Sequence, residues 1–228
     1  MMHLAIVIPA YNEGKVIKKV IDSLPRKLSH IEKISVIVVN DGSVDDTVLE
    51  IKKTKAILLN HIVNLGYGSA TITGLETAKK IEADIAVTFD GDGQHDPRDI
   101  AAIIRPIIEG KADLVIGSRL LNAKEMPWIK KIGNWFLNFV TRVLSGYKTS
   151  DSQSGFKVFS RYALSKFNLD TMGYEICSEI IMEAARNKLK IKEIPIKTIY
   201  SNYSKKKGQS IINGINIVGK LIARRIRG

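Results

Sequence analysis

Three aspartates and one histidine fall within the short stretch FDGDGQHDP, residues 89–97. Asp90 and Asp92 directly follow an apolar run, and the glycine between them allows a tight backbone path. Two carboxylates at this spacing can surround one divalent cation, and hard oxygen ligands favour Mg²⁺ or Mn²⁺. Gln94 would add an amide oxygen. The sequence therefore predicts a metal site formed by Asp90, Asp92 and Gln94.

Two other protein classes contain comparable acidic stretches, and the neighbouring residues count against both. A calcium-binding EF-hand loop needs glycine at its sixth position and glutamate at its twelfth, where counting from Asp90 gives His95 and Ala101. The haloacid-dehalogenase phosphatases use a similar pair of aspartates, but Gln94 stands where threonine or valine usually follows. A magnesium-dependent phosphohydrolase remains the alternative from another class.

The two remaining ionisable residues of this stretch have supporting roles. Asp96 precedes Pro97, a residue that suits the first turn of a helix, so Asp96 is expected to cap that helix. His95 is expected to be exposed, or to support a metal ligand, rather than to bind the metal itself.

The acidic stretch lies within an alternation of strand-like and helix-like segments. The predicted strands of the first half cover residues 4–9, 34–39, 56–59, 85–89 and 113–117, and helical spacing occupies 16–24 and 97–108. Near-continuous apolar strands between helices indicate an α/β fold with a mostly parallel, Rossmann-like sheet covered by helices on both faces. The second half predicts helices over 126–144, 174–188 and 210–228, a strand over 155–160 and an edge strand over 190–200.

Polar residues follow three of the predicted strands at the point where each strand ends. They are Tyr11, Asn12 and Glu13; Asn40 and Asp41; and Asp90 and Asp92. Because the carboxyl ends of parallel strands meet at one edge of a sheet, ligands bind there, and clustered carboxylates are costly unless they are paired or bound to metal. Asp41 is expected to accept from a base N–H or a ribose hydroxyl, while Asp45 or Asp46 caps the next helix.

The net charge points to an anionic partner. The chain of 228 residues has 35 Lys and Arg against 23 Asp and Glu, a formal charge of +12, and basic residues gather at 204–210 and 220–228. Such a charge suits nucleic acid, an anionic membrane or phosphorylated substrates. No zinc-finger spacing or basic-aromatic stripe is present, so we expect no nucleic-acid partner. The single cysteine, Cys177, excludes an internal disulfide and favours a cytoplasmic setting.

Six motifs, in order, carry a specific family resemblance: IVIPAYNE, VVNDGSVDDT, NLGYGSATITGL, FDGDGQHDP, IGSR and DSQSGFK. The set resembles the family 2 nucleotide-sugar glycosyltransferases of GT-A fold, most of all the dolichyl-phosphate mannose/glucose synthase branch. The resemblance implies one GT-A domain over residues 1–208, with a nucleotide-sugar-binding half over 1–120 and an acceptor-binding half over 121–208. A basic amphipathic helix over 209–228 would follow.

The resemblance also implies roles for individual residues. The donor would be bound by Pro9, Ala10, Tyr11, Glu13, Asp41, Asp90, Gly91 and Arg119. The metal would be held by Asp90, Asp92 and Gln94, and the chemistry would rest on Asp92, Arg119, Asp151 and Glu175. Asp151 and Gln153 would lie near the sugar, and Gly155 and Phe156 would shape the acceptor side. The acceptor phosphate would meet Lys205, Lys206, Lys207 and Ser210, where lysine replaces the family's arginine and Ile211 its final lysine.

The nature of the acceptor decides whether a general base is required. A hydroxyl acceptor needs a positioned carboxylate, whereas a phosphate monoester is already ionised. The sequence lacks a Glu-Asp pair near Glu175 and lacks the Gln-x-x-Arg-Trp motif of processive polysaccharide synthases. We therefore predict metal-dependent, inverting transfer of a hexose from a UDP- or GDP-sugar to a polyprenyl or dolichyl phosphate. The alternatives are a hydroxyl acceptor, with Glu175 or Glu179 as base, and a non-catalytic binding module.

A lipid acceptor would explain two amphipathic segments. Residues 210–228 have an apolar face and a cluster of arginines at the end, and residues 126–144 mix aromatic and basic side chains. No run approaches the ~20 apolar residues of a membrane span. We expect peripheral attachment to the cytoplasmic face of an anionic membrane. The alternative is that these segments pack on the sheet or form a homodimer contact.

Overall fold

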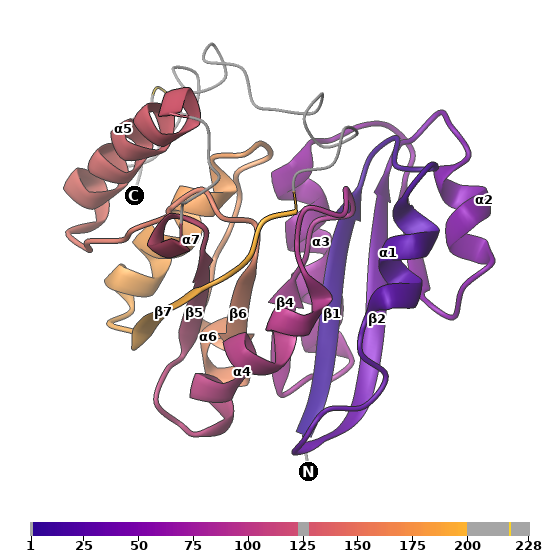
Figure 1. Cartoon of the computed structure of the whole chain (residues 1–228), viewed down its shortest axis with the longest axis horizontal. Coiled ribbons are helices and arrows are strands. Elements are labelled where there is room, and N and C mark those ends of the chain that lie inside the picture. The colour runs from indigo at the N-terminus through magenta and orange to yellow at the C-terminus, as the bar shows by residue number, and fades with distance from the viewer. Residues whose placement is uncertain (1, 123–127, 200–218, 220–228) are drawn as a thin grey trace.

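Seven strands form one sheet in the computed structural model, which describes residues 2–122, 128–199 and 219 (Figure 1). The strands are β1 (Met2–Ala10), β2 (Ile31–Asp41), β3 (Ile57–His61), β4 (Ile85–Thr88), β5 (Leu114–Ser118), β6 (Lys157–Ser160) and β7 (Ile191–Pro195). Their order is β3-β2-β1-β4-β6-β5-β7. Among these strands only β6 runs antiparallel to its neighbours, β4 and β5.

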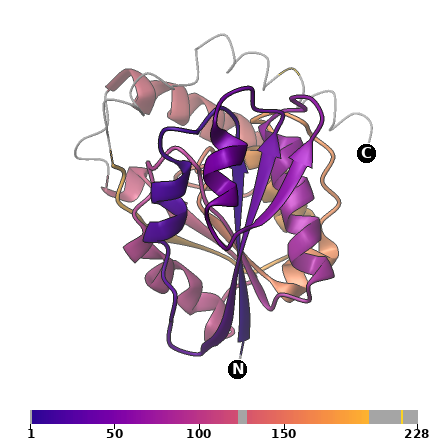
Figure 2. The ribbon, with the colours of Figure 1, turned by 90° about the vertical axis from the view of Figure 1, so that its right-hand side faces the viewer.

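Helices cover both faces of the sheet, as the view turned by 90° shows (Figure 2). The helices are α1 (Ile17–Ser23), α2 (Thr47–Lys52), α3 (Tyr67–Lys80), α4 (Ile100–Ile108), α5 (Trp128–Ser145), α6 (Arg161–Lys166) and α7 (Ile176–Arg186). Short 3₁₀ turns cover Pro97–Asp99 and Leu120–Asn122. Helices α1 and α4 pack on one face and α3, α6 and α7 on the other, while α5 packs on α7.

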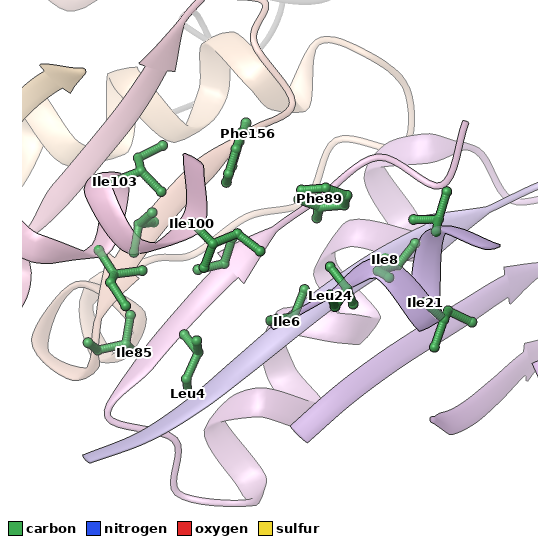
Figure 3. Close-up of a cluster of buried hydrophobic side chains, with 14 of the residues drawn as sticks. Leu4, Ile6, Ile8, Ile21, Leu24, Ile85, Phe89, Ile100, Ile103 and Phe156 are labelled. Carbon is green, nitrogen blue, oxygen red and sulfur yellow. The ribbon is translucent and has the colours of Figure 1, made fainter. Parts of the chain in front are cut away.

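The strand alternation of β1 divides the core between the two faces. Leu4, Ile6 and Ile8 are fully buried against the side chains of α1 and α4 (Figure 3). Ala5 and Val7 face the other way, into the cluster that contains α3, α6 and α7. Each buried branched side chain contributes about 1.5–3 kcal/mol to folding, so β1 anchors both layers of helices.

The predicted architecture is confirmed: the protein is an α/β fold of one mostly parallel sheet with helices on both faces. Strand β7 lies at the sheet edge, as the sequence predicts, but it ends at Pro195, earlier than the expected strand over 190–200. Asp96 caps the turn at Pro97, because its Oδ1 accepts from the backbone N of Arg98 at 3.0 Å. Asp45 accepts from the backbone N of Thr47, at 3.0 Å, at the start of α2.

The expected strand over 155–160 begins only at Lys157 in the structure. Residues 150–156 form a loop instead, which reaches the carboxyl edge of the sheet. The expected C-terminal helix over 210–228, and the predicted acceptor residues Lys205, Lys206, Lys207 and Ser210, lie outside the described residues. Within the described part of the chain, no helix combines the length and apolar character needed to cross a membrane.

Candidate active site

Asp90 follows β4 at the carboxyl edge of the sheet, and its carboxylate is held from two sides. The Oη of Tyr67, at the start of α3, donates to Asp90 Oδ1 at 3.0 Å. The Nε2 of His95 hydrogen bonds to Oδ2 at 2.8 Å. A Cβ added to Gly155 would lie 2.5 and 2.6 Å from the two carboxylate oxygens, so only glycine fits at 155. Asp90 is therefore oriented, while its side chain keeps 27% of its surface exposed.

Asp92 and Gln94 form the second part of the acidic turn. The backbone N of Gln94 donates to Asp92 Oδ1 at 2.9 Å, and the Gln94 side-chain amide donates to Oδ2. Burial, followed by the negative charge of Asp90, raises the pKa of Asp92. Burial acts in the same direction on Asp90, but the charge and hydrogen bond of His95 and the bond from Tyr67 outweigh it and lower the pKa of Asp90.

The donor set of this turn fits a divalent cation. Two adjacent carboxylates and one amide are hard oxygen ligands, and a cation would relieve the repulsion that raises the pKa of Asp92. In the described part of the chain no group of three or more His, Cys, Asp or Glu side chains gathers into a metal site. The two carboxylates and one amide of the turn match a cation that takes one or two carboxylates from the protein and its remaining oxygens from substrate phosphates.

His95 is buried, with 3% of its surface exposed, so the expectation of an exposed residue is wrong. Its ring contacts those of Phe89 and Phe156, with centroid distances of 5.4 and 5.0 Å, and these two rings also contact each other at 5.3 Å. These apolar rings hold the imidazole where its Nε2 meets Asp90. The other option in the sequence analysis, support of a predicted metal ligand, agrees with this position.

Arg119 follows β5 and is paired with Asp151. Its Nε donates to Asp151 Oδ2 and its Nη2 to Oδ1, both at 2.8 Å, and its backbone N donates to Oδ2 at 3.0 Å. Burial would raise the pKa of Asp151, but the charge and hydrogen bonds of Arg119 outweigh it and lower that pKa. A two-pronged pair of this kind fixes the plane of the guanidinium.

The structure shows Asp151 buried beside Arg119, and its expected place near the sugar stays a prediction. Asp151 has no exposed surface, and both its oxygens face Arg119, which keeps 21% of its side chain exposed. Asp151 therefore orients Arg119 and has no surface with which to touch a substrate. Gln153 is also buried, with its amide donating to Ser178 Oγ on α7 at 2.8 Å.

The loop over residues 150–156 is held from the interior by two residues that the sequence analysis did not select. Asn138 on α5 donates to the backbone O of Ser150 at 2.6 Å and accepts from the backbone N of Ser152 at 2.7 Å. The buried Lys157 donates to the backbone oxygens of Ser152 and Ser154, and burial lowers its pKa. Their types gave no sign of this, because asparagine in a helix and lysine in a strand usually face solvent.

The carboxylate of Asp41, at the end of β2, is hydrogen bonded to other groups of the protein. Its Oδ1 accepts from the backbone N of Leu65 at 2.9 Å and contacts His61 Nδ1 at 2.7 Å, while Oδ2 accepts from Gly66 N at 2.8 Å. With 3% of its surface exposed, Asp41 holds the turn before α3. Its contact with a nucleoside stays a prediction.

The end of β1 packs beside the acidic turn. A Cβ on Gly91 would lie 3.2 Å from the backbone O of Pro9, so β1 and the turn are in close contact. Ala10 and Glu13 are buried, and Glu13 N donates to Thr47 Oγ1 at 2.7 Å. Tyr11 is 45% exposed.

The two glutamates of α7 that were candidate bases are both buried. Glu175 is 3% exposed and accepts from the backbone N of Gly173 at 3.2 Å. Glu179 has no exposed surface and accepts from the backbone N of Asp170 at 2.8 Å and of Thr171 at 3.1 Å. Burial raises the pKa of Glu179 to about 7, against the hydrogen bonds from Thr171 and with help from the charges of Glu183 and Glu175.

A parallel-stranded α/β sheet whose carboxyl edge combines this acidic turn with an oriented arginine defines a glycosyltransferase of GT-A fold. The chain belongs to glycosyl transferase family 2, whose sequence model matches residues 5–167.

Relatives and solved structures agree with this assignment. The chain is 44% identical over 239 aligned residues to the UDP-N-acetylglucosamine–dolichyl-phosphate N-acetylglucosaminyltransferase of Methanococcus voltae, covering 95% of this chain and 94% of that protein. It is 27% identical to the undecaprenyl-phosphate mannosyltransferase of Micrococcus luteus, covering 99% and 93%. The fold matches glucosyl-3-phosphoglycerate synthase of Mycobacterium tuberculosis, crystallised with Mn²⁺, UDP-glucose and phosphoglyceric acid, with a TM-score of 0.75 at 19% identity, covering 98% and 80%.

The raised pKa of Glu179 leads to a prediction about stability. The folded state binds this proton more tightly than the unfolded chain, so ionisation of Glu179 lowers the free energy of unfolding as pH rises from 4.5 to about 7. Glu179→Gln removes the charge. Relative to wild type, we expect this variant to gain up to about 3 kcal/mol between pH 5 and pH 8, measured by urea unfolding.

Glu76→Gln is the control, because Glu76 is 51% exposed on α3 and should show no such gain. An equal pH dependence of wild type and Glu179→Gln would contradict the assignment.

Proposed function

We propose that this glycosyltransferase moves a hexose from a UDP- or GDP-sugar to a polyprenyl phosphate of dolichyl type, with a divalent cation and with inversion at the anomeric carbon. The observation that carries the proposal is the acidic turn of Asp90 and Asp92 at the same sheet edge as Arg119, whose charge acts on Asp90. The relatives from M. voltae and M. luteus act on dolichyl and undecaprenyl phosphate, which supports a lipid phosphate as acceptor.

The residues at the carboxyl edge of the sheet would contribute to donor activation in different ways. Asp90, Asp92 and Gln94 would hold Mg²⁺ or Mn²⁺, and the bound cation would neutralise charge that develops on the leaving diphosphate. Tyr67 and His95 fix the orientation of Asp90. Arg119 adds a second positive charge, already oriented, so little reorganisation is needed as the bond to the sugar breaks.

A phosphate acceptor agrees with the state of the α7 glutamates. A general base must reach the proton that it removes. Glu175 and Glu179 are buried and accept from backbone N–H groups of their own chain, so neither presents a carboxylate to an acceptor. An ionised phosphate needs orientation and positive charge in place of a base.

The predicted acceptor lysines come soon after Ile199 in the sequence, and the backbone of Ile199 is hydrogen bonded to the acidic turn. The backbone N of Ile199 donates to the backbone O of Gln94 at 2.8 Å. Lys205 comes six residues later, and six residues span at most about 20 Å. This span allows Lys205 to reach a phosphate at the edge, and we propose that Lys206, Lys207 and Ser210 act with it.

The donor and acceptor can be tested with a panel of labelled UDP- and GDP-sugars and polyprenyl phosphate, with and without Mn²⁺. UDP-N-acetylglucosamine is the first donor to test, because the M. voltae relative is named for it. We expect lipid-extractable label only with Mn²⁺ or Mg²⁺, and a loss of at least about a hundredfold in Asp92→Asn. Release of diphosphate without acceptor would favour the phosphohydrolase, and unchanged transfer in Asp92→Asn would refute the metal assignment.

Neutralising the basic segment separates acceptor from donor binding. In the triple variant Lys205→Gln, Lys206→Gln, Lys207→Gln, we expect KM for polyprenyl phosphate to rise about tenfold or more, and KM for the donor to change little. The same three substitutions at Lys52, Lys53 and Lys55, which are exposed around α2, control for net charge. Equal increases in both KM values would contradict the acceptor role.

Helix α5 presents an apolar surface suited to a lipid bilayer. Ile132, Trp135, Phe136, Phe139 and Val143 are 47–69% exposed, and the rings of Trp135 and Phe139 stack at 6.2 Å. Arg142 is exposed on the same helix, while Leu137 and Thr141 face inward. Because Asn138 ties α5 to the loop that orients Arg119, a bilayer against this surface would bring its lipid phosphates to the site.

Replacing two aromatic residues tests this surface. We expect Trp135→Ser with Phe139→Ser to weaken binding to anionic phosphatidylglycerol vesicles by about tenfold or more in a sedimentation assay. Leu49→Ser with Tyr162→Ser, at exposed positions of α2 and α6, is the control. If vesicle binding were unchanged and light scattering showed a dimer become a monomer, α5 would be a homodimer contact instead.

A further inference from the structure

The buried side chain of Glu179 accepts hydrogen bonds from residues 170 and 171, which precede it in the sequence. Its Oε1 accepts from the backbone N of Asp170 at 2.8 Å, and its Oε2 accepts from the backbone N of Thr171 at 3.1 Å and from Thr171 Oγ1. All three donors belong to residues 170–173, here called the 170–173 segment. A buried carboxylate that accepts three hydrogen bonds fixes the position of this segment strongly.

The 170–173 segment in turn holds the start of α3. The backbone O of Met172 accepts from Gly68 N at 2.7 Å and from Ser69 N at 3.2 Å, two of the N–H groups that a helix leaves unsatisfied at its start. A Cβ added to Gly66 would lie 2.5 Å from the same oxygen. Glycine is therefore required for this close approach, and the start of α3 cannot shift without losing both hydrogen bonds.

Tyr67 lies between Gly66 and Gly68 in the sequence, and its side chain extends to Asp90. Its ring stacks on Tyr174 at 5.0 Å with an angle of 16° between the planes. Its Oη donates to Asp90 Oδ1 at 3.0 Å. Burial, followed by the charge of Asp90, raises the pKa of Tyr67 well above its usual value, so the phenol stays protonated and remains a donor.

We infer that Glu179 is a positioning residue for the donor site, acting through the 170–173 segment and the start of α3 on Tyr67 and Asp90. This role rests on the proposed function in so far as Asp90 serves the donor. It replaces the earlier interpretation of Glu179 as an alternative general base. The hydrogen bonds that Glu179 accepts from the 170–173 segment connect it to the start of α3, and none of its surface is open to an acceptor.

If Glu179 has this positioning role, the substitution Glu179→Gln should weaken donor binding without lowering the stability of the fold. Glutamine at 179 keeps the size of the side chain but offers one acceptor oxygen and places an NH₂ group against a backbone N–H. The 170–173 segment should loosen. Because the substitution also removes a buried charge, the melting temperature at pH 8 should not fall. A residue with a general structural role would lower both.

The test combines hydrogen exchange with binding, on the full chain. In Glu179→Gln we expect amide exchange at Gly68 and Ser69 to be about tenfold faster, and the Kd of UDP with Mn²⁺ to rise about tenfold by calorimetry. KM for polyprenyl phosphate should stay within about twofold. Tyr67→Phe should weaken UDP binding similarly, and the double variant should be no weaker than Tyr67→Phe alone, because both act through one contact.

Glu183→Gln is the matched control. Glu183 lies one turn further along the same buried side of α7, and the partners of its side chain, Arg186 and Asn187, belong to the end of that helix. This variant should change neither exchange at Gly68 nor UDP binding.

Three results would overturn the inference: unchanged exchange and UDP affinity in Glu179→Gln, a fall in melting temperature that accounts for the lost binding, or a fall in kcat with donor affinity intact. If wild-type protein bound no nucleotide, the proposed function would fail instead. Exchange at Gly68 and Ser69 needs no substrate, so it would still decide whether Glu179 holds the start of α3.

Discussion

The negative charge of Asp90, just beyond the carboxyl end of the central strand β4, is stabilised by groups from both sides of that strand in the chain. Burial alone would raise the pKa of Asp90. Tyr67 comes from the helix before β4, His95 from the turn after it, and Gly155 from the loop before β6 leaves the necessary space. The start of α3, the acidic turn and the loop before β6 all meet at this one carboxylate.

Arg119 is likewise a charged group that needs a partner, and the loop that carries this partner is held by a residue of α5. Breaking a buried ion pair leaves an uncompensated charge, so Arg119 and Asp151 must keep their geometry. Asp151 lies on a loop without regular structure, and Asn138 and Lys157 supply the hydrogen bonds that its backbone would otherwise lack. The apolar core around β1 offsets the cost of these buried polar groups.

Local patterns were sufficient to predict the strands and the acidic turn, because their signals lie within a few residues. The apolar runs, the Asp-Gly-Asp spacing and the Asp96 cap each involve neighbours in sequence. The roles of Asp41, Asp151 and Tyr67 depend on partners 23–32 residues away. An aspartate that ends a strand looks the same in sequence whether it keeps exposed surface, as Asp90 does, or faces the backbone of a later turn, as Asp41 does. The one available signal for Tyr67 was its place between two glycines.

The fate of the acidic residues also limits the chemistry that the site can perform. In the described part of the chain, Asp41, Asp151, Glu175 and Glu179 all accept from groups of the protein itself and are at most 4% exposed. Asp90 and Asp92 keep exposed surface, and two adjacent carboxylates that share a turn suit a cation better than a proton. An acceptor that arrives already ionised needs no carboxylate to remove its proton. It needs positive charge, which we propose that the lysines following Ile199 in the sequence supply.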